Sequence, residues 1–177
     1  MKGIMFNTKY GLEQAVLRGG KTRTWRAGVK PIYKVGEIVA IKQSYHTILD
    51  DDKEYCKQIG ILSDSGHLYC HWAEQMGWEN KMFVKNELMP HQIRITAVKQ
   101  CKLQDLNERQ ALDEGIEKVV KNVFGGDLIS PYYTFLNAKM FCTTSVSSFA
   151  YLIDKLNGKG YWDSNPDGYA YEFELVK

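Results

Sequence analysis

The chain has 177 residues, of which 44% are hydrophobic and 25% are charged. These values predict one globular domain that buries a sizeable core without a disulfide or metal staple. No stretch approaches the roughly 18 apolar residues of a membrane span, and charged residues interrupt the first 20 positions, where a signal peptide would have its apolar core. We therefore expect an intracellular, cytoplasmic protein, with no membrane partner, whose cysteines are reduced.

The charge is unevenly distributed along the chain, although the total is only +2. Residues 1–49 contain nine basic and two acidic side chains, whereas residues 50–177 contain 14 basic and 19 acidic ones. Three of the basic residues lie in the segment from Lys21 to Arg26, which also contains Trp25. Because Arg and Lys pair with phosphates and an indole stacks on bases, this segment favours a nucleic-acid contact. A solvated basic loop is the alternative.

The N-terminal quarter predicts a strand, a helix and a basic loop. The apolar run 3–6 is typical of a first strand. Asn7 and Thr8 are helix-capping residues, and the apolar spacing that follows predicts a helix to about Leu17, ended by Gly19 and Gly20. The basic segment 21–26 then falls on the loop after this helix.

The middle of the chain predicts two strands around an irregular insertion. Residues 35–45 are rich in β-branched and aromatic side chains, which favours a strand. Residues 46–82 lack clean periodicity, so we expect an irregular insertion with a hairpin around 64–66. The alternation of polar and apolar residues over 91–98 predicts a half-buried strand.

The C-terminal half predicts two helices and a last strand. Asn107 and Gln110 form a capping box, and helical spacing continues to Val123 through Gly115, which weakens a helix by about 1 kcal/mol relative to Ala. Ser145 is expected to cap a second helix that ends before Gly158. Residues 169–176 alternate again as a strand. These elements predict an α+β fold with a small mixed or barrel-like sheet.

A metal site is weakly indicated in the insertion. Cys56, His67, Cys70 and His71 are zinc-type ligands, but the chain contains no CxxC pair. Structural thiols and exposed histidines are the simpler interpretation, also for Cys101 and Cys142. We therefore expect no metal and no cofactor.

Lys21 and Thr24 are three residues apart, a spacing that lets both side chains face one cleft. A hydroxyl becomes a nucleophile when a base removes its proton, and a desolvated lysine can be that base. The alternative is a threonine bound to the loop backbone beside a lysine that faces phosphate.

Several motifs, taken in order, resemble those of ASCH domains, a PUA-like family. The segment Gly20–Arg26 resembles the family's GxKxxTxR motif. The agreement continues in five further segments: 33–37, 93–98, 103–106, 111–116 and 172–175. The phrases at 78–83 and 162–166 resemble a longer ASCH subgroup that is common in bacteria and their phages. The resemblance implies a mixed PUA-like barrel flanked by helices, as a single domain over 1–177 with insertions at about 46–82 and 121–144.

The resemblance also implies a function. ASCH domains are proposed to bind RNA in a cleft bordered by the motif loop, and a bacterial branch hydrolyses the amide of N4-acetylcytidine with a Lys, a Thr and a Glu. The matching residues are Lys21 as base, Thr24 as nucleophile and Glu114 as the charge partner of the lysine, with Arg26 or the amides of the 20–24 loop for the oxyanion.

We thus expect a binding module for RNA or a modified nucleotide or nucleoside, in a cleft lined by Lys21, Thr24, Arg26 and Glu114. The expected ligand-binding residues are Lys21, Arg23, Trp25, Arg26, Tyr45 and Asn165. An amidohydrolase that deacylates N4-acetylcytidine-like nucleosides is the alternative, although that branch is much shorter and lacks the insertion 46–82. A phage accessory protein that acts through protein contacts is a third possibility.

Overall fold

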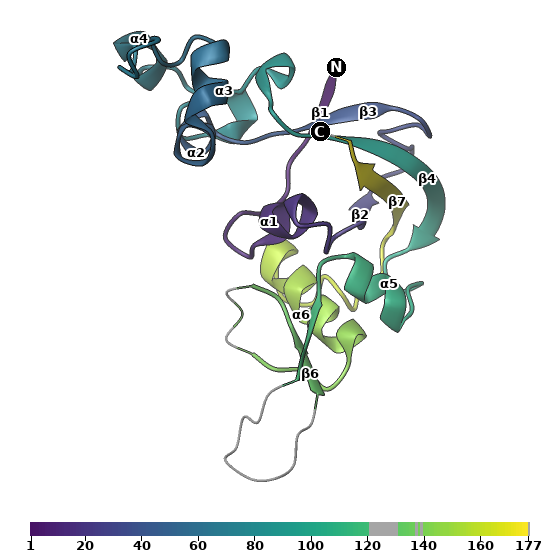
Figure 1. Cartoon of the computed structure of the whole chain (residues 1–177). Coiled ribbons are helices and arrows are strands. Elements are labelled where there is room, and N and C mark those ends of the chain that lie inside the picture. The colour runs from purple at the N-terminus through teal and green to yellow at the C-terminus, as the bar shows by residue number, and fades with distance from the viewer. Residues whose placement is uncertain (121–130, 137, 139, 177) are drawn as a thin grey trace, which may run out of the picture. The chain divides into compact units, whose positions relative to one another are not determined.

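The computed structural model describes residues 1–120, 131–136, 138 and 140–176 (Figure 1). It contains a mixed five-stranded sheet of order β1-β3-β4-β7-β2, a two-stranded ribbon, and several helices. The predicted α+β class is therefore confirmed, while the sheet of the described residues does not close into a barrel. The chain divides into two compact units: one formed by residues 1–6, 38–94 and 175–177, and one by 7–37 and 95–174.

The first unit combines short strands with a helical segment. In it, β1 (Lys2–Ile4) is parallel to β3 (Ile38–Ile41), which pairs antiparallel with the start of β4 (Gln92–Lys102). The helices of this unit are α2 (Tyr45–Asp51), α3 (Lys53–Gln58), α4 (Cys70–Ala73) and the 3-10 turns η1 (Lys81–Phe83) and η2 (Asn86–Leu88).

The expectation of an irregular segment over 46–82 is wrong, because two polar side chains cap helices there. Ser44 accepts a hydrogen bond from the Thr47 N–H, and Asp52 accepts one from the Tyr55 N–H. The expected strand 35–45 is correspondingly short. The hairpin is present as a single bridge between Leu62 and Leu68. The helices enclose a core formed by Ala40, Tyr45, Ile48, Cys56, Ile61, Leu62, Trp72, Val84 and Met89.

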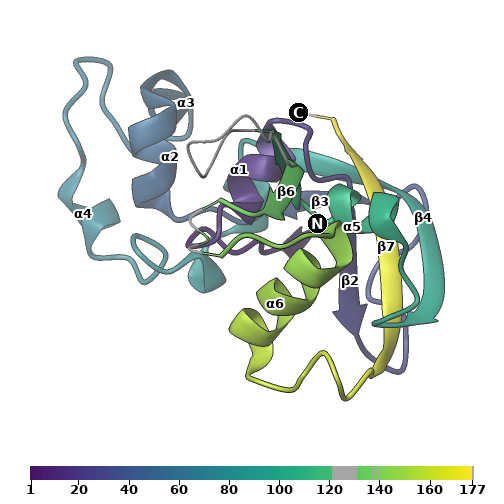
Figure 2. The same ribbon diagram turned by 90° about the horizontal axis from the view of Figure 1, so that it is seen from below.

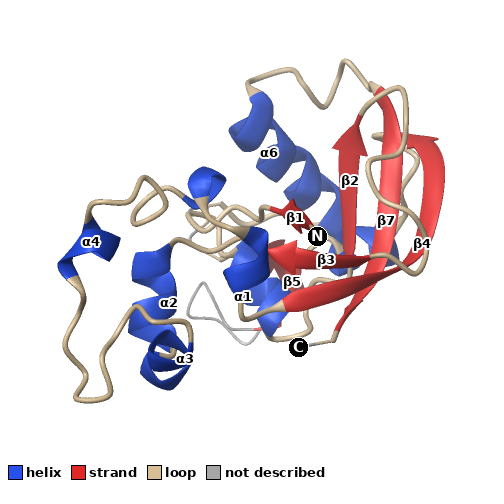
Figure 3. Ribbon diagram, turned by 90° about the horizontal axis from the view of Figure 1, so that it is seen from above, coloured by secondary structure: helices blue, strands red, loops and turns tan. Residues whose placement is uncertain are grey.

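The second unit holds the motif segment. Its elements are α1 (Leu12–Leu17), β2 (Arg23–Ala27), α5 (Glu108–Asp113), β5 (Glu117–Val120), β6 (Pro131–Thr134), α6 (Ser145–Asn157) and β7 (Asp167–Leu175), together with most of β4. β2 and β7 are antiparallel, and α6 lies to one side of β2 while β7 and β4 lie to the other (Figures 2 and 3). The apolar side chains buried in this unit include Leu12, Val16, Leu103, Phe149, Leu152 and Phe173.

Two expectations about the N-terminal segment need correction. The first helix begins at Leu12, because Asn7 Oδ1 accepts from the Tyr10 N–H and thereby closes a turn ahead of the helix. The basic segment is largely a strand, since Arg23–Ala27 is β2. The sequence does not predict this strand, because its polar side chains do not alternate with apolar ones.

The capping box of α5 is confirmed: Asn107 and Gln110 each accept a hydrogen bond from the other's backbone N–H. However, the helix stops after Asp113 because Gly115 adopts φ +98°, a left-handed conformation that ends helices. The apolar residues that follow form β5, and Val123 lies outside the described residues. The second predicted helix is confirmed as α6, with Thr144 as its N-cap.

Candidate functional site

The motif turn, residues 19–22, is held between the C-terminal ends of two helices. The Ala15 carbonyl at the end of α1 accepts hydrogen bonds from the Gly20 and Lys21 N–H groups. The Thr22 N–H donates to the Asp113 carbonyl at the end of α5, at 2.9 Å. These bonds place Lys21 next to Glu114, which is 93 positions away in sequence.

Two cations share the Glu114 carboxylate. Lys21 Nζ lies 2.8 Å from Oε2 and also donates to the Glu114 carbonyl at 2.6 Å. Arg23 Nη1 donates to Oε1 at 2.7 Å. Lys21 thus binds both the side chain of Glu114 and a carbonyl at the open end of α5, where cations are favoured. We call Lys21, Arg23 and Glu114 the buried charge cluster.

The cluster is sealed from solvent: Lys21 and Glu114 are 3% exposed and Arg23 is 4% exposed. Burial lowers the pKa of the Lys21 ammonium below its ordinary value of 10.5, because desolvation disfavours the charged form. Glu114 opposes this shift, while Arg26 and Arg23 add to it. Two cations thus share one carboxylate within the cluster.

The lowered pKa predicts how stability depends on pH. Between the folded-state pKa of Lys21 and 10.5, the unfolded chain binds more protons than the folded chain, so the free energy of unfolding rises with pH. We expect Lys21→Met to flatten this rise, because methionine does not titrate. Urea unfolding of both proteins at a series of alkaline pH values measures the difference. Equal pH dependence in the two proteins would contradict the assignment.

Thr24 and Arg26 differ from Arg23 in their orientation on the strand. Side chains alternate along a strand, so Thr24 and Arg26 leave β2 on the face opposite to Arg23. Thr24 is paired with Tyr171 across the sheet and is itself buried. Of the predicted set of Lys21, Thr24 and Glu114, hydrogen bonds join Lys21 to Glu114, and Arg23 is the third member of that cluster.

The other predicted ligand-binding residues are in structural positions. Trp25 is 8% exposed and directs its indole N–H toward the Cys101 carbonyl, at 3.4 Å. Tyr45 is buried in the core of the first unit. Asn165, at φ +42°, accepts from the Gln104 N–H with its side-chain oxygen, at 2.9 Å. Each of these three side chains therefore contacts another part of the protein.

A recess of about 500 Å³ opens against the motif turn. The turn contributes Gly19, Gly20 and Thr22, and α5 and β5 supply the remaining lining. The other lining residues are Arg109, Leu112, Asp113, Ile116, Glu117 and Lys118. Its wall thus combines two cations, two carboxylates, a hydroxyl and two apolar side chains.

The sequence did not predict the residues that line this recess, although two of them are neighbours of predicted site residues. Thr22 is inside the recognised motif, and Asp113 precedes Glu114. Lys118 was not predicted because the sequence pattern extends α5 through Gly115, which would place Lys118 on a helix instead of a strand. Gly115 was the signal in the sequence that could have ended this helix and predicted a separate element containing Lys118.

Other candidate sites receive no support. Within the ranges that the structure describes, no group of three His, Cys, Asp or Glu side chains could hold a metal ion. All four cysteines are free, and only Cys56 is buried. Among the described helices, none combines the length and the apolar character needed to cross a membrane.

Comparison of the chain with protein-family models, curated proteins and solved structures gave no match.

Proposed function

We propose that this chain is an ASCH-like, PUA-like binding module for RNA or for a modified nucleotide or nucleoside. Its ligand occupies the recess at the motif turn. The proposal is supported by the motif resemblance and by one structural observation: the recess lies against the turn in which the resemblance is strongest. This is the place where the family's ligand cleft is expected.

The lining of the recess suits a nucleotide. Leu112 offers apolar surface to a base, and Thr22 offers a hydroxyl. Lys118 can pair with phosphate, as can Arg109, which is ion-paired with Asp113 at 3.2 Å. The buried charge cluster adds an excess of positive charge next to the turn, which favours an anion. The volume of about 500 Å³ is within the range of small-molecule pockets.

Binding of nucleotides to a recess double variant tests the proposal. Arg109→Gln combined with Lys118→Gln is expected to weaken nucleotide binding about tenfold, since charge-assisted hydrogen bonds to phosphate are lost. Isothermal titration calorimetry with uridine and cytidine monophosphates measures this. Lys53→Gln, on the exposed start of α3, is the control for charge and should leave the affinity unchanged. No binding by the native protein, or equal binding by the double variant, would contradict the recess assignment.

The amidohydrolase is the second candidate, favoured by Lys21 alone. A lysine whose pKa is lowered by burial can act as a general base, and Glu114 orients its amine. The position of Thr24 on the opposite face of β2 gives the nucleophile no such support. Incubation with N4-acetylcytidine, followed by ultraviolet absorbance, tests this candidate. Absence of turnover by the native protein would remove this candidate. Turnover that survives Lys21→Ala or Glu114→Ala would remove these two residues from the mechanism, and turnover that survives Thr24→Val would remove Thr24 as the nucleophile.

A further inference from the structure

The loop that follows β2, residues 28–37, exposes an unusual combination of side chains. Val29 is 93% exposed, Ile32 49% and Val35 63%. Between them stand Lys30 and Lys34, which are also exposed. We call these residues the basic loop. Exposed apolar side chains beside charges on an ordered loop indicate a contact surface.

Two tyrosines of β7 hold the basic loop in place. The Ile32 N–H donates to the Tyr171 hydroxyl at 2.8 Å, and the Tyr33 ring packs edge-on against Tyr171 at 5.3 Å. Near the start of the loop, the Tyr169 hydroxyl donates to the Val29 carbonyl at 3.5 Å. The loop is therefore held at Val29 and Ile32, on either side of Lys30, whose side chain is exposed.

A turn fixes the end of the loop. The Glu37 N–H donates to the Lys34 carbonyl at 3.1 Å, and the Glu37 carboxylate accepts from the Lys34 N–H at 2.9 Å. Gly36 adopts φ +81° in this turn, a conformation that favours glycine, and its N–H donates to the Ile95 carbonyl. This anchoring lowers the entropy that Lys34 would lose on binding a ligand.

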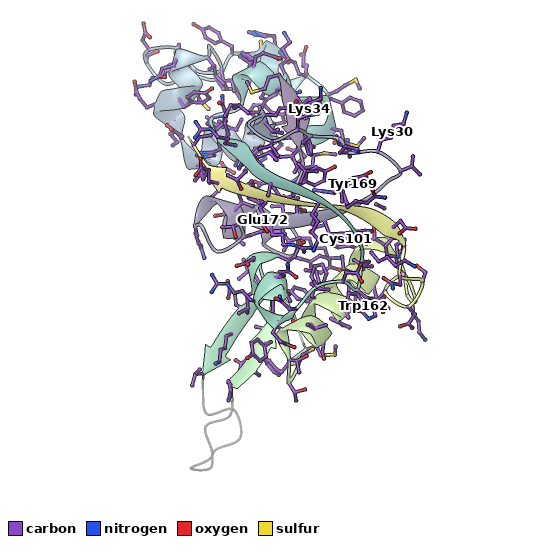
Figure 4. All side chains as sticks on the ribbon, turned by 90° about the vertical axis from the view of Figure 1, so that its right-hand side faces the viewer. Lys30, Lys34, Cys101, Trp162, Tyr169 and Glu172 are labelled. Carbon is purple, nitrogen blue, oxygen red and sulfur yellow. The ribbon has the colours of Figure 1, made fainter. Side chains whose placement is uncertain are left out.

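The basic loop carries two lysines and one carboxylate, Glu37, which is bound to the Lys34 N–H. Residues 26–36 include Arg26, Lys30 and Lys34 and contain no acidic residue. Burial raises the pKa of the Tyr33 hydroxyl, and the positive charge of Arg26 opposes this rise. The register pairs Arg26 with Tyr169, a half-buried aromatic residue, and Figure 4 labels Tyr169 with Lys30 and Lys34.

We propose that the basic loop is a second contact for a single-stranded RNA, so that the ligand of this protein is a polymer and not a lone nucleotide. The inference rests on the function proposed for the recess. Lys30 and Lys34 pair with phosphates, and Tyr169 stacks on a base, as in sites that bind single strands. The apolar side chains of the loop pack against ribose and base surfaces.

The two contacts are too far apart for one nucleotide. β2 separates the motif turn from the basic loop, and its five residues extend about 16 Å at the usual rise of a strand. A chain of several nucleotides covers such a distance, and single-strand sites commonly span about 4–16 nucleotides. Binding should therefore tighten with oligonucleotide length until both contacts are occupied.

Two affinity measurements test the inference. Fluorescence anisotropy measures binding of labelled oligouridylates of two to twelve nucleotides, and calorimetry measures binding of uridine monophosphate. Lys30→Gln combined with Lys34→Gln is expected to weaken binding of the longer oligomers about tenfold and to reduce the salt slope by about 1.4, or 0.7 for each lost phosphate contact. Binding of the mononucleotide should not change. Lys53→Gln combined with Lys159→Gln removes the same charge from exposed positions elsewhere and should leave every affinity unchanged.

The outcomes separate the two proposals. If the native protein binds the mononucleotide and the oligomers equally, or if the loop variant binds the long oligomers normally, the basic loop is not an RNA contact and the recess stands. If the native protein binds neither probe, both proposals fail. Val29→Ser combined with Val35→Ser should change the oligomer affinity less than the lysine pair does. A larger loss would assign the loop to an apolar partner and overturn the inference.

Discussion

Glu114→Ala is expected to lower the free energy of unfolding by about 3–5 kcal/mol, the cost of removing one partner from a buried ion pair. The reason is the 2:1 composition of the cluster. With alanine at this position, the Arg23 guanidinium is left buried without its carboxylate partner. Lys21 loses its side-chain acceptor at 2.8 Å at the same time. Urea unfolding followed by circular dichroism measures the change.

The control for this substitution lies three residues further along. Glu117→Ala removes a carboxylate from an exposed position of β5 and should change stability by no more than about 0.5 kcal/mol. Similar losses for the two variants would show that the cluster does not stabilise the fold through its charges.

A triple variant tests whether the charges of the cluster serve stability or ligand binding. Replacement of a buried ion network by apolar residues of similar size is often neutral or stabilising. We therefore expect Lys21→Met, Arg23→Met and Glu114→Leu together to recover most of the stability that Glu114→Ala loses. If the recovered protein no longer binds nucleotides, the positive charge behind the motif turn serves the ligand. Unchanged binding would mean that the cluster has no role in it.

Local signals in the sequence predicted those elements whose ends are set by neighbouring residues. Asn107 and Gln110 predicted the start of α5 because a capping box is complete within four positions. The alternation in β4 likewise predicted that strand. Gly115 was recognised as a weak point, yet the apolar residues after it have the spacing of a helix, and only the structure distinguishes β5 from a continued α5.

Distant partners determined what the sequence did not predict. Arg23 is a poor strand residue by its own character, and β2 tolerates it because Glu114 neutralises it from 91 positions away. The pairing of Lys21 with Glu114 followed from the family resemblance alone, since no local pattern joins them. Trp25 was expected to face a ligand because it lies between basic residues, but the structure buries its ring close to Gly168 of β7.

Trp25→Ala is expected to lower the free energy of unfolding strongly, because the indole is 8% exposed and lies where β2 pairs with β7. Even a Cβ atom added at Gly168 would lie 2.5 Å from the Trp25 ring, which shows how closely β7 approaches it. Truncation of such a side chain leaves a cavity and costs about 3–5 kcal/mol. Phe83→Ala, which truncates a 52% exposed aromatic residue, should cost about 0.5 kcal/mol or less.

Trp25→Phe separates a packing role from a stacking role. Phenylalanine keeps most of the buried surface and loses the N–H that faces the Cys101 carbonyl, so a cost of about 0.5–1.5 kcal/mol in stability is expected. If the indole belongs to the core, nucleotide affinity measured by calorimetry stays within about twofold, well below the 1–3 kcal/mol that a stacked base contributes. A large loss of affinity in a stably folded Trp25→Phe protein would return Trp25 to the ligand site, and would mean that β2 opens when the ligand binds.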